Sequence, residues 1–188
     1  ITHAISGIDI ALWDILGKVT GQPISRLLGG RYRETIKPYA SLLMDDSGCM
    51  IRELEAGLER GFRAFKIGWG PFGRIDRKMD RQIVASARAT VGDEVELMVD
   101  AGGSDAFWPH GYKWALNTSK MLADFNVCWF EEPLRPDDFD GYKRLTAVST
   151  VPIAGCEVLT RRQSFLPWIE QQAVDYVQPD VTKVGGIS

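Results

Sequence analysis

Three acidic residues end three successive apolar segments, a placement that could support metal chemistry. Asp100 follows LMV, Glu131 follows WF, and Glu157 follows IAGC. If these segments are neighbouring strands of a parallel barrel, their ends lie about 5 Å apart and the carboxylates converge. Hard oxygen ligands of this number and charge suit Mg²⁺, with Mn²⁺ as the alternative. Each acid could instead cap the next helix, but two of the three are Glu, a poor capping residue, so the pattern favours a metal site.

Two further ionisable residues occupy comparable places. Lys66 lies in the apolar segment AFKIG, at the end of a strand opposite the acids. A lysine there could act as a general base with a lowered pKa or pair with a substrate oxyanion. The other interpretation is a lysine that buries only its aliphatic stem and keeps its ammonium in water. Asp180 ends the segment VQPD. It could be a fourth ligand, a capping residue, or a carboxylate that orients a histidine base.

Composition excludes several classes of partner. The chain has 188 residues, 45% of them hydrophobic, and a formal net charge of −3, without a run of Lys or Arg. These values indicate a globular protein and argue against binding to nucleic acid or an anionic membrane. No apolar segment approaches the roughly 18 residues that span a bilayer. Three irregularly spaced cysteines are typical of reduced thiols, so we expect a cytoplasmic protein.

Short apolar segments alternate with longer amphipathic ones, and this pattern positions the ionisable residues. It predicts strands at 36–42, 62–68, 96–100, 128–131, 152–157 and 175–180. It predicts helices near 46–60, 74–90, 111–125, 138–148 and 162–171. Consecutive βα units occur in both a (β/α)₈ barrel and a doubly wound open sheet. Polar residues or glycines at the carboxyl ends of the strands favour the barrel.

The first residues differ from the rest of the chain. Apolar residues between Ile5 and Leu16 recur at three- and four-residue spacing, which predicts a helix with one buried face that Gly21 and Pro23 terminate. We interpret 1–188 as a single partial barrel domain, with a helix and linker at 1–35 and six βα units at 36–188. A closed barrel needs about 250 residues, so we expect a longer polypeptide. Six strands leave two open edges, so the isolated segment should fold poorly or associate.

Several motifs, taken in order, resemble the mandelate racemase and muconate lactonising branch of the enolase superfamily. They are GIDIALWD with GQP and LLGG, then GFRAFK, MVD, WFEEP, VPI, and PD with KVGG. The resemblance implies an enolase-like barrel domain that lacks its amino-terminal capping domain and its last two βα units. It implies Mg²⁺ ligands at Asp100, Glu131 and Glu157. It also implies that Glu132 lies next to these ligands without binding the metal itself. It also implies that Asp180 pairs with a histidine of the seventh strand.

The chain departs from that family at two points. His3 and His110 are its only histidines, and neither can occupy the seventh-strand place. The family carries Lys-x-Lys on strand two, where ungapped alignment gives Lys66 and Gly68; a two-residue shift would place Lys66 in the second, basic position. With Gly68 there, one face of the substrate lacks its usual base, and racemisation needs an acid or base on each face.

We therefore expect a lyase. It removes the proton α to a carboxylate, and the metal stabilises the enediolate that forms. The reaction we favour is dehydration of an acid sugar. Removal of such protons by a Lys or His base together with Mg²⁺ is a known pattern of the superfamily. A racemase, epimerase or cycloisomerase is the alternative, and a non-catalytic binding protein is an alternative of another class. A phosphate-binding barrel using Gly185 and Gly186 is disfavoured. We expect a small-molecule carboxylate as partner and a homo-oligomer in the full-length protein.

Overall fold

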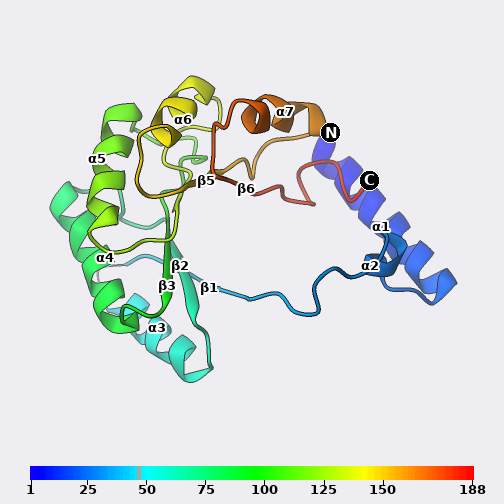
Figure 1. The fold of residues 1–188 in the computed structure, drawn as a ribbon, viewed down its shortest axis with the longest axis horizontal. Coiled ribbons are helices and arrows are strands. Elements are labelled where there is room, and N and C mark those ends of the chain that lie inside the picture. Colours follow the sequence, from blue (N-terminus) through cyan, green and yellow to red (C-terminus); the bar gives the residue numbers. More distant parts are fainter. Residues whose placement is uncertain (46–47) are drawn as a thin grey trace. The chain divides into compact units, whose positions relative to one another are not determined.

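The computed structural model describes residues 1–45 and 48–188, which group into two compact units. The larger unit consists of Pro38–Gly155 and Trp168–Val177. The smaller unit consists of Ile1–Lys37, Cys156–Pro167 and Gln178–Ser188. Every strand of the described residues belongs to the larger unit, which therefore contains the whole sheet (Figure 1).

Within the described residues, the sheet has six parallel strands whose spatial order follows the sequence. They are β1 (Ala40–Leu43), β2 (Ala64–Gly68), β3 (Glu96–Asp100), β4 (Phe130–Glu131), β5 (Ile153–Gly155) and β6 (Tyr176–Val177). A doubly wound sheet would reverse its strand order at a switch point, and this one does not. This order confirms the predicted α/β fold and agrees with the predicted incomplete (β/α)₈ barrel.

Burial on both faces explains why these segments are strands. Phe65 and Ile67 of β2 share one face of the sheet with Leu97 and Val99 of β3, and Met98 of β3 points to the opposite face; all of them are buried. Parallel strands covered on both faces have nearly continuous apolar sequences, as these do. The two strands therefore give the larger unit a core that fixes the positions of their carboxyl ends.

In the described part of the chain, one helix follows each of the first five strands. They are α3 (Cys49–Glu59), α4 (Arg77–Val91), α5 (Tyr112–Ala123), α6 (Phe139–Thr146) and α7 (Arg162–Glu170). All five were predicted, although residues 46–47, where the first was expected to begin, lie outside the described residues. Asp76 caps α4 by accepting a hydrogen bond from the Met79 amide at 2.8 Å. Helices α3, α4 and α5 lie along one side of β1–β3 (Figure 1).

Arg88 of α4 ties the ends of two helices to the start of β3. Arg88 is 7% exposed, and its guanidinium donates four hydrogen bonds of 2.6 to 3.0 Å to backbone carbonyls. The acceptors are the carbonyls of Gly92, Val95, Phe125 and Asn126. Because Val95 immediately precedes β3, Arg88 helps to fix the strand that ends at Asp100.

Replacing Arg88 with methionine is expected to destabilise the chain by about 4 kcal/mol, because four carbonyls lose a charged donor in a largely buried site. Urea unfolding monitored by circular dichroism measures this change. Arg88→Lys, which keeps the charge but offers a point donor in place of a planar fork, should recover part of the loss. A loss below 1 kcal/mol for the methionine variant would contradict the role assigned to Arg88.

The smaller unit contains α1 (Thr2–Thr20) and α2 (Ile24–Leu27). Helix α1 ends as predicted at Gly21, whose φ of 63° is the left-handed conformation that glycine adopts readily. The Asp9 carboxylate of α1 accepts hydrogen bonds from the amides of Ile187 and Ser188. Within this unit, the carboxyl-terminal residues therefore pack on the first helix.

The prediction that α1 buries its apolar face is wrong for the described residues. Ile8, Leu12 and Ile15 are 63%, 59% and 56% exposed. Helical periodicity shows that a face is apolar, but it does not identify the element that covers it. No helix of the described chain is long and apolar enough to cross a membrane.

Candidate active site

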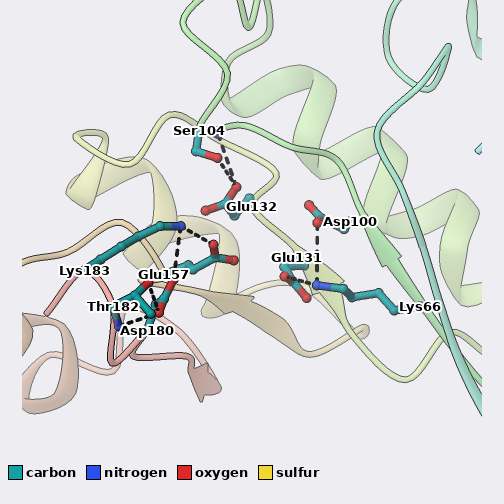
Figure 2. A network of polar contacts seen from close by, with 9 residues as sticks. All are labelled: Lys66, Asp100, Ser104, Glu131, Glu132, Glu157, Asp180, Thr182 and Lys183. Carbon is teal, nitrogen blue, oxygen red and sulfur yellow. Dashed lines mark hydrogen bonds and ion pairs between the residues drawn. The ribbon is translucent and has the colours of Figure 1, made fainter. Parts of the chain in front are cut away.

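Three predicted site residues of the larger unit meet at the carboxyl ends of adjacent strands. In the sheet register, Gly68 of β2 is paired with Asp100 of β3, and Asp100 is paired with Glu131 of β4. Lys66 lies two residues before Gly68, so its side chain leaves the same face of β2. Its Nζ is 2.6 Å from Glu131 Oε1 and 3.7 Å from Asp100 Oδ2 (Figure 2). The fold thus brings Lys66, Asp100 and Glu131 into one cluster.

Burial makes the electrostatics of this cluster strong. The side chains of Lys66, Asp100 and Glu131 are 11%, 9% and 1% exposed. Burial, and next the charge of Glu131, raise the pKa of the Asp100 carboxyl to about 7. For Lys66, burial acts to lower the pKa, but the charge and hydrogen bond of Glu131, with the charge of Asp100, outweigh it and raise the pKa. The ammonium is therefore held in its charged form.

Hydrogen bonds orient both carboxylates. Trp129 Nε1 donates to Glu131 Oε2 at 2.9 Å, and the Gly102 amide donates to Asp100 Oδ1 at 2.8 Å. Trp129 was missed in the sequence, although it lies two residues before Glu131, and the alternation of side chains along a strand places such residues on one face. The hydrogen bond from its indole fixes the orientation of the Glu131 carboxylate beside Lys66.

The chemistry of these donors fits a hard divalent cation. Two carboxylates share one ammonium, and the raised pKa of Asp100 reflects the cost of ionising both in a buried place. Carboxylate oxygens are the ligands that Mg²⁺ prefers, and a cation beside them would remove that cost. Among residues 1–45 and 48–188, however, no three His, Cys, Asp or Glu side chains form a preassembled metal cage.

Glu132 has a different environment from its neighbour. It is 5% exposed, and its Oε2 accepts hydrogen bonds from Ser104 Oγ at 2.5 Å and from the Ser104 amide at 3.3 Å (Figure 2). Ser104 lies in the loop after β3, and no sequence pattern singled it out. The pair connects the end of β4 to the loop that follows Asp100.

Replacing Ser104 with alanine is expected to destabilise the chain by about 2 kcal/mol, because a buried carboxylate loses a hydroxyl donor. Thermal unfolding in the presence of EDTA measures the effect without interference from metal ions. Ser104→Thr keeps the hydroxyl and serves as the matched control. An alanine variant as stable as the wild type would show that water replaces the Ser104 hydroxyl at no cost.

The remaining predicted residues, Glu157 and Asp180, belong to the smaller unit and share a lysine there. Lys183 Nζ donates a hydrogen bond to Glu157 Oε1 and lies 3.4 Å from Asp180 Oδ2 (Figure 2). Asp180 also accepts from the hydroxyl and the amide of Thr182, and these two hydrogen bonds are the main causes of its lowered pKa. No sequence pattern predicts this role for Lys183.

Strand β6 ends at Val177, so the prediction of a strand as far as Asp180 is wrong. Asp180 Oδ1 accepts from the amide two residues ahead, an arrangement that forms a turn and not a strand. Because Glu157 lies in the smaller unit, its membership of a ligand set with Asp100 and Glu131 stays a prediction. The pairing of Asp180 with a seventh-strand histidine likewise stays a prediction.

His110 is occupied by structural contacts. Its Nε2 is 2.6 Å from the Gly73 carbonyl oxygen, and its ring stacks on Trp114 with centroids 4.4 Å apart. His110 is therefore half-buried against an aromatic neighbour and is not a freely solvated loop residue. On β2, a Cβ at Gly68 would lie 2.9 Å from Asp100 Cβ, so Asp100 occupies the space beside Gly68 and Lys66 is the one lysine of this strand.

Comparison with known proteins gives two family matches. Residues 50–188 match the family model described as enolase C-terminal domain-like. Residues 1–29 match the model described as mandelate racemase / muconate lactonizing enzyme, N-terminal domain. The first match covers the larger part of the chain and all the predicted metal ligands.

Individual relatives agree with these matches. The chain is 39% identical to D-galactarolactone cycloisomerase of Agrobacterium fabrum, covering 98% of this chain and 48% of the relative. It is 34% identical to L-talarate/galactarate dehydratase of Salmonella typhimurium, covering 99% and 45%. A crystal structure of a Bradyrhizobium enolase complexed with magnesium and mandelic acid has a TM-score of 0.89 at 33% identity, covering 100% and 50%. The chain spans about half the length of the relatives it matches.

Proposed function

Because this chain belongs to the enolase superfamily, in its mandelate racemase and muconate lactonizing enzyme branch, we propose that it forms part of a Mg²⁺-dependent enzyme acting on sugar acids. The reaction begins with removal of the proton α to the substrate carboxylate. One observation carries this proposal: a buried lysine lies between two buried carboxylates at the carboxyl ends of neighbouring strands. Catalytic groups of parallel barrels occupy this end of the sheet.

Asp100 and Glu131 are the two ligands that the geometry supports, and Glu157 is the third ligand predicted from the sequence. When bound, Mg²⁺ would share the negative charge that develops on the substrate carboxylate as the α-proton leaves. The magnesium and mandelic acid bound by the Bradyrhizobium relative support this choice of ion. Trp129 and the Gly102 amide hold the two carboxylates in place before any substrate arrives.

Lys66 supplies a fixed positive charge beside these carboxylates. Because Glu131 and Asp100 raise its pKa, Lys66 stays protonated beside them and has no lone pair with which to accept the substrate proton. We assign it the role of a cation that pairs with a substrate oxygen. This electrostatic pairing becomes stronger as negative charge develops on that oxygen in the enediolate. The base on the other face would be the histidine predicted to pair with Asp180.

Dehydration is the outcome we favour. The base takes the α-proton, the electron pair forms a carbon–carbon double bond, and the β-hydroxyl leaves as water after it receives a proton. The resulting enol becomes a 2-keto-3-deoxy acid. Gly68 leaves β2 without a second lysine, which argues against a two-base racemisation. The talarate/galactarate dehydratase relative supports this outcome.

A cycloisomerase is the second candidate, because the Agrobacterium relative at 39% identity has that activity. It would begin with the same proton removal but would expel a ring oxygen that stays in the molecule. The two reactions differ in mass balance, since only dehydration releases water.

Incubation of the purified protein with D-gluconate or galactarate and Mg²⁺ in D₂O tests the proposal. We expect a 2-keto-3-deoxy product by mass spectrometry, 18 mass units lighter than the substrate before deuterium is counted. Recovered substrate that carries deuterium with inverted configuration would instead indicate a racemase. The absence of both turnover and Mg²⁺-dependent binding would favour a non-catalytic binding protein.

A further inference from the structure

Trp69, the residue that follows β2, has an unusual combination of exposure and backbone conformation. Its side chain is 42% exposed, and its φ is 62°, in the left-handed region that residues with large side chains rarely adopt. The next residue, Gly70, also has a positive φ of 66°. Two successive residues of this kind form a tight turn directly after the strand that carries Lys66.

The turn requires glycine at one of its positions and not at the other. A Cβ at Gly70 would lie 2.2 Å from the Met44 carbonyl oxygen, so only glycine fits there. Nothing comparable requires tryptophan at the preceding position, where glycine would relieve the strained φ. Residues held in such conformations cluster at ligand-binding sites, which makes the Trp69 side chain a candidate for a function beyond packing.

Trp69 is joined to the Asp100 region by two contacts. Its amide donates to the Asp100 carbonyl oxygen at 3.1 Å. Its ring lies over Gly102, where a Cβ would be 3.0 Å from the ring atoms Cδ2 and Cε2. The Gly102 amide in turn donates to the Asp100 carboxylate. The indole therefore lies on the residue that orients a candidate metal ligand, and part of its surface faces solvent.

The position before Trp69 lies against Asp100, because a Cβ at Gly68 would be 2.9 Å from Asp100 Cβ. Gly68 has no side chain, and it is paired in the sheet with Asp100. The partly exposed indole of Trp69, whose amide bonds the Asp100 carbonyl oxygen, therefore offers an apolar surface next to a polar, charged cluster. Binding sites for small molecules combine these two features, a few placed polar groups and aromatic walls.

We propose that Trp69 is a specificity-determining residue that contacts the carbon chain of a polyhydroxy acid whose carboxylate is held at the Asp100–Glu131 cluster. This inference rests on the proposed function and names the substrate class more narrowly. The carbon chain of a sugar acid presents C–H groups between its hydroxyls, and the negative face of an indole attracts them while excluding water. A short hydroxy acid has no such chain and would gain nothing from Trp69.

Isothermal titration calorimetry with two probes in the presence of Mg²⁺ tests this proposal. D-gluconate has the polyol chain, whereas D-lactate has the same α-hydroxycarboxylate group without it. Trp69→Gly is the main variant, because glycine adopts the positive φ without strain. We expect it to bind D-gluconate about fivefold to tenfold more weakly than the wild type, and D-lactate within twofold of it. Trp69→Phe should retain most of the affinity for D-gluconate.

Phe107→Ala is the matched control, because Phe107 is an aromatic residue that is 88% exposed in the loop after β3. It should leave both affinities unchanged. Equal losses for both probes in the Trp69→Gly variant, or no loss for D-gluconate, would overturn the role of Trp69. Wild-type protein that binds neither probe would overturn the proposed function as well, so the two failures are distinguishable. Unfolding midpoints show whether each variant is folded, and Trp69→Phe decides the matter if the glycine variant is not.

Discussion

Asp100→Asn is expected to make the metal-free protein more stable at pH 8 while abolishing Mg²⁺-dependent turnover. Burial and Glu131 raise the pKa of Asp100 from 3.8 to about 7 in the folded chain. Between these values the folded state retains a proton that the unfolded state has released, so wild-type stability falls as the pH rises from 4 to 7. The full loss, up to about 4 kcal/mol, is present above pH 7. Asparagine has no charge to bury and can still accept the Gly102 hydrogen bond.

Urea unfolding at pH 4 and pH 8 in EDTA measures this effect. The two proteins should be similar at pH 4, and the variant should be more stable at pH 8. Added Mg²⁺ should stabilise only the wild type, by about 2.7 kcal/mol at a hundredfold excess over the dissociation constant. A variant that responds to Mg²⁺ as strongly as the wild type would remove Asp100 from the ligand set. A pH-independent difference would show that its burial is not the source of the effect.

The same residue illustrates how far the sequence could predict the fold. The predicted strand at 96–100 has the same bounds as β3 in the structure. A strand that is buried on both faces has a nearly continuous apolar sequence, and this pattern can be recognised without the structure. Strand β6 has only two residues, and its end at Val177 depends on pairing with β5, which no local pattern reports. The prediction that α1 buries its apolar face is wrong for a related reason: periodicity identifies an apolar face but not the element that covers it.

For the candidate site, the sequence identified residues at strand ends but not their supporting contacts. Asp100 and Glu131 could be predicted because successive parallel strands bring their carboxyl ends to one edge. Ser104, which holds Glu132, lies in a loop whose path is set by tertiary contacts. Lys183 pairs with Glu157, 26 residues away in the sequence, and both lie outside the strands. Such pairs become evident only when the chain is folded.

Lys66→Met is expected to destabilise the metal-free protein by about 3 to 5 kcal/mol and to lower kcat by at least about a hundredfold. The stability loss arises because Lys66 is the ammonium 2.6 Å from Glu131, which is 1% exposed, and its removal leaves a buried negative charge without this partner. The loss of activity arises because the substrate oxygens lose a fixed cation during enediolate formation. Lys66→Arg keeps the charge and should restore stability more fully than activity, since its planar group differs in shape.

Mg²⁺ separates the structural effect of Lys66 from its effect on the reaction. A divalent cation beside Asp100 and Glu131 offsets their charge, so it should restore most of the stability of Lys66→Met in urea unfolding. Methionine cannot pair with a substrate oxygen, so turnover of galactarate should remain low in the metal-loaded variant. If activity returned together with stability, Lys66 would serve only to hold the two carboxylates, and the cation that acts on the substrate would have to come from another residue.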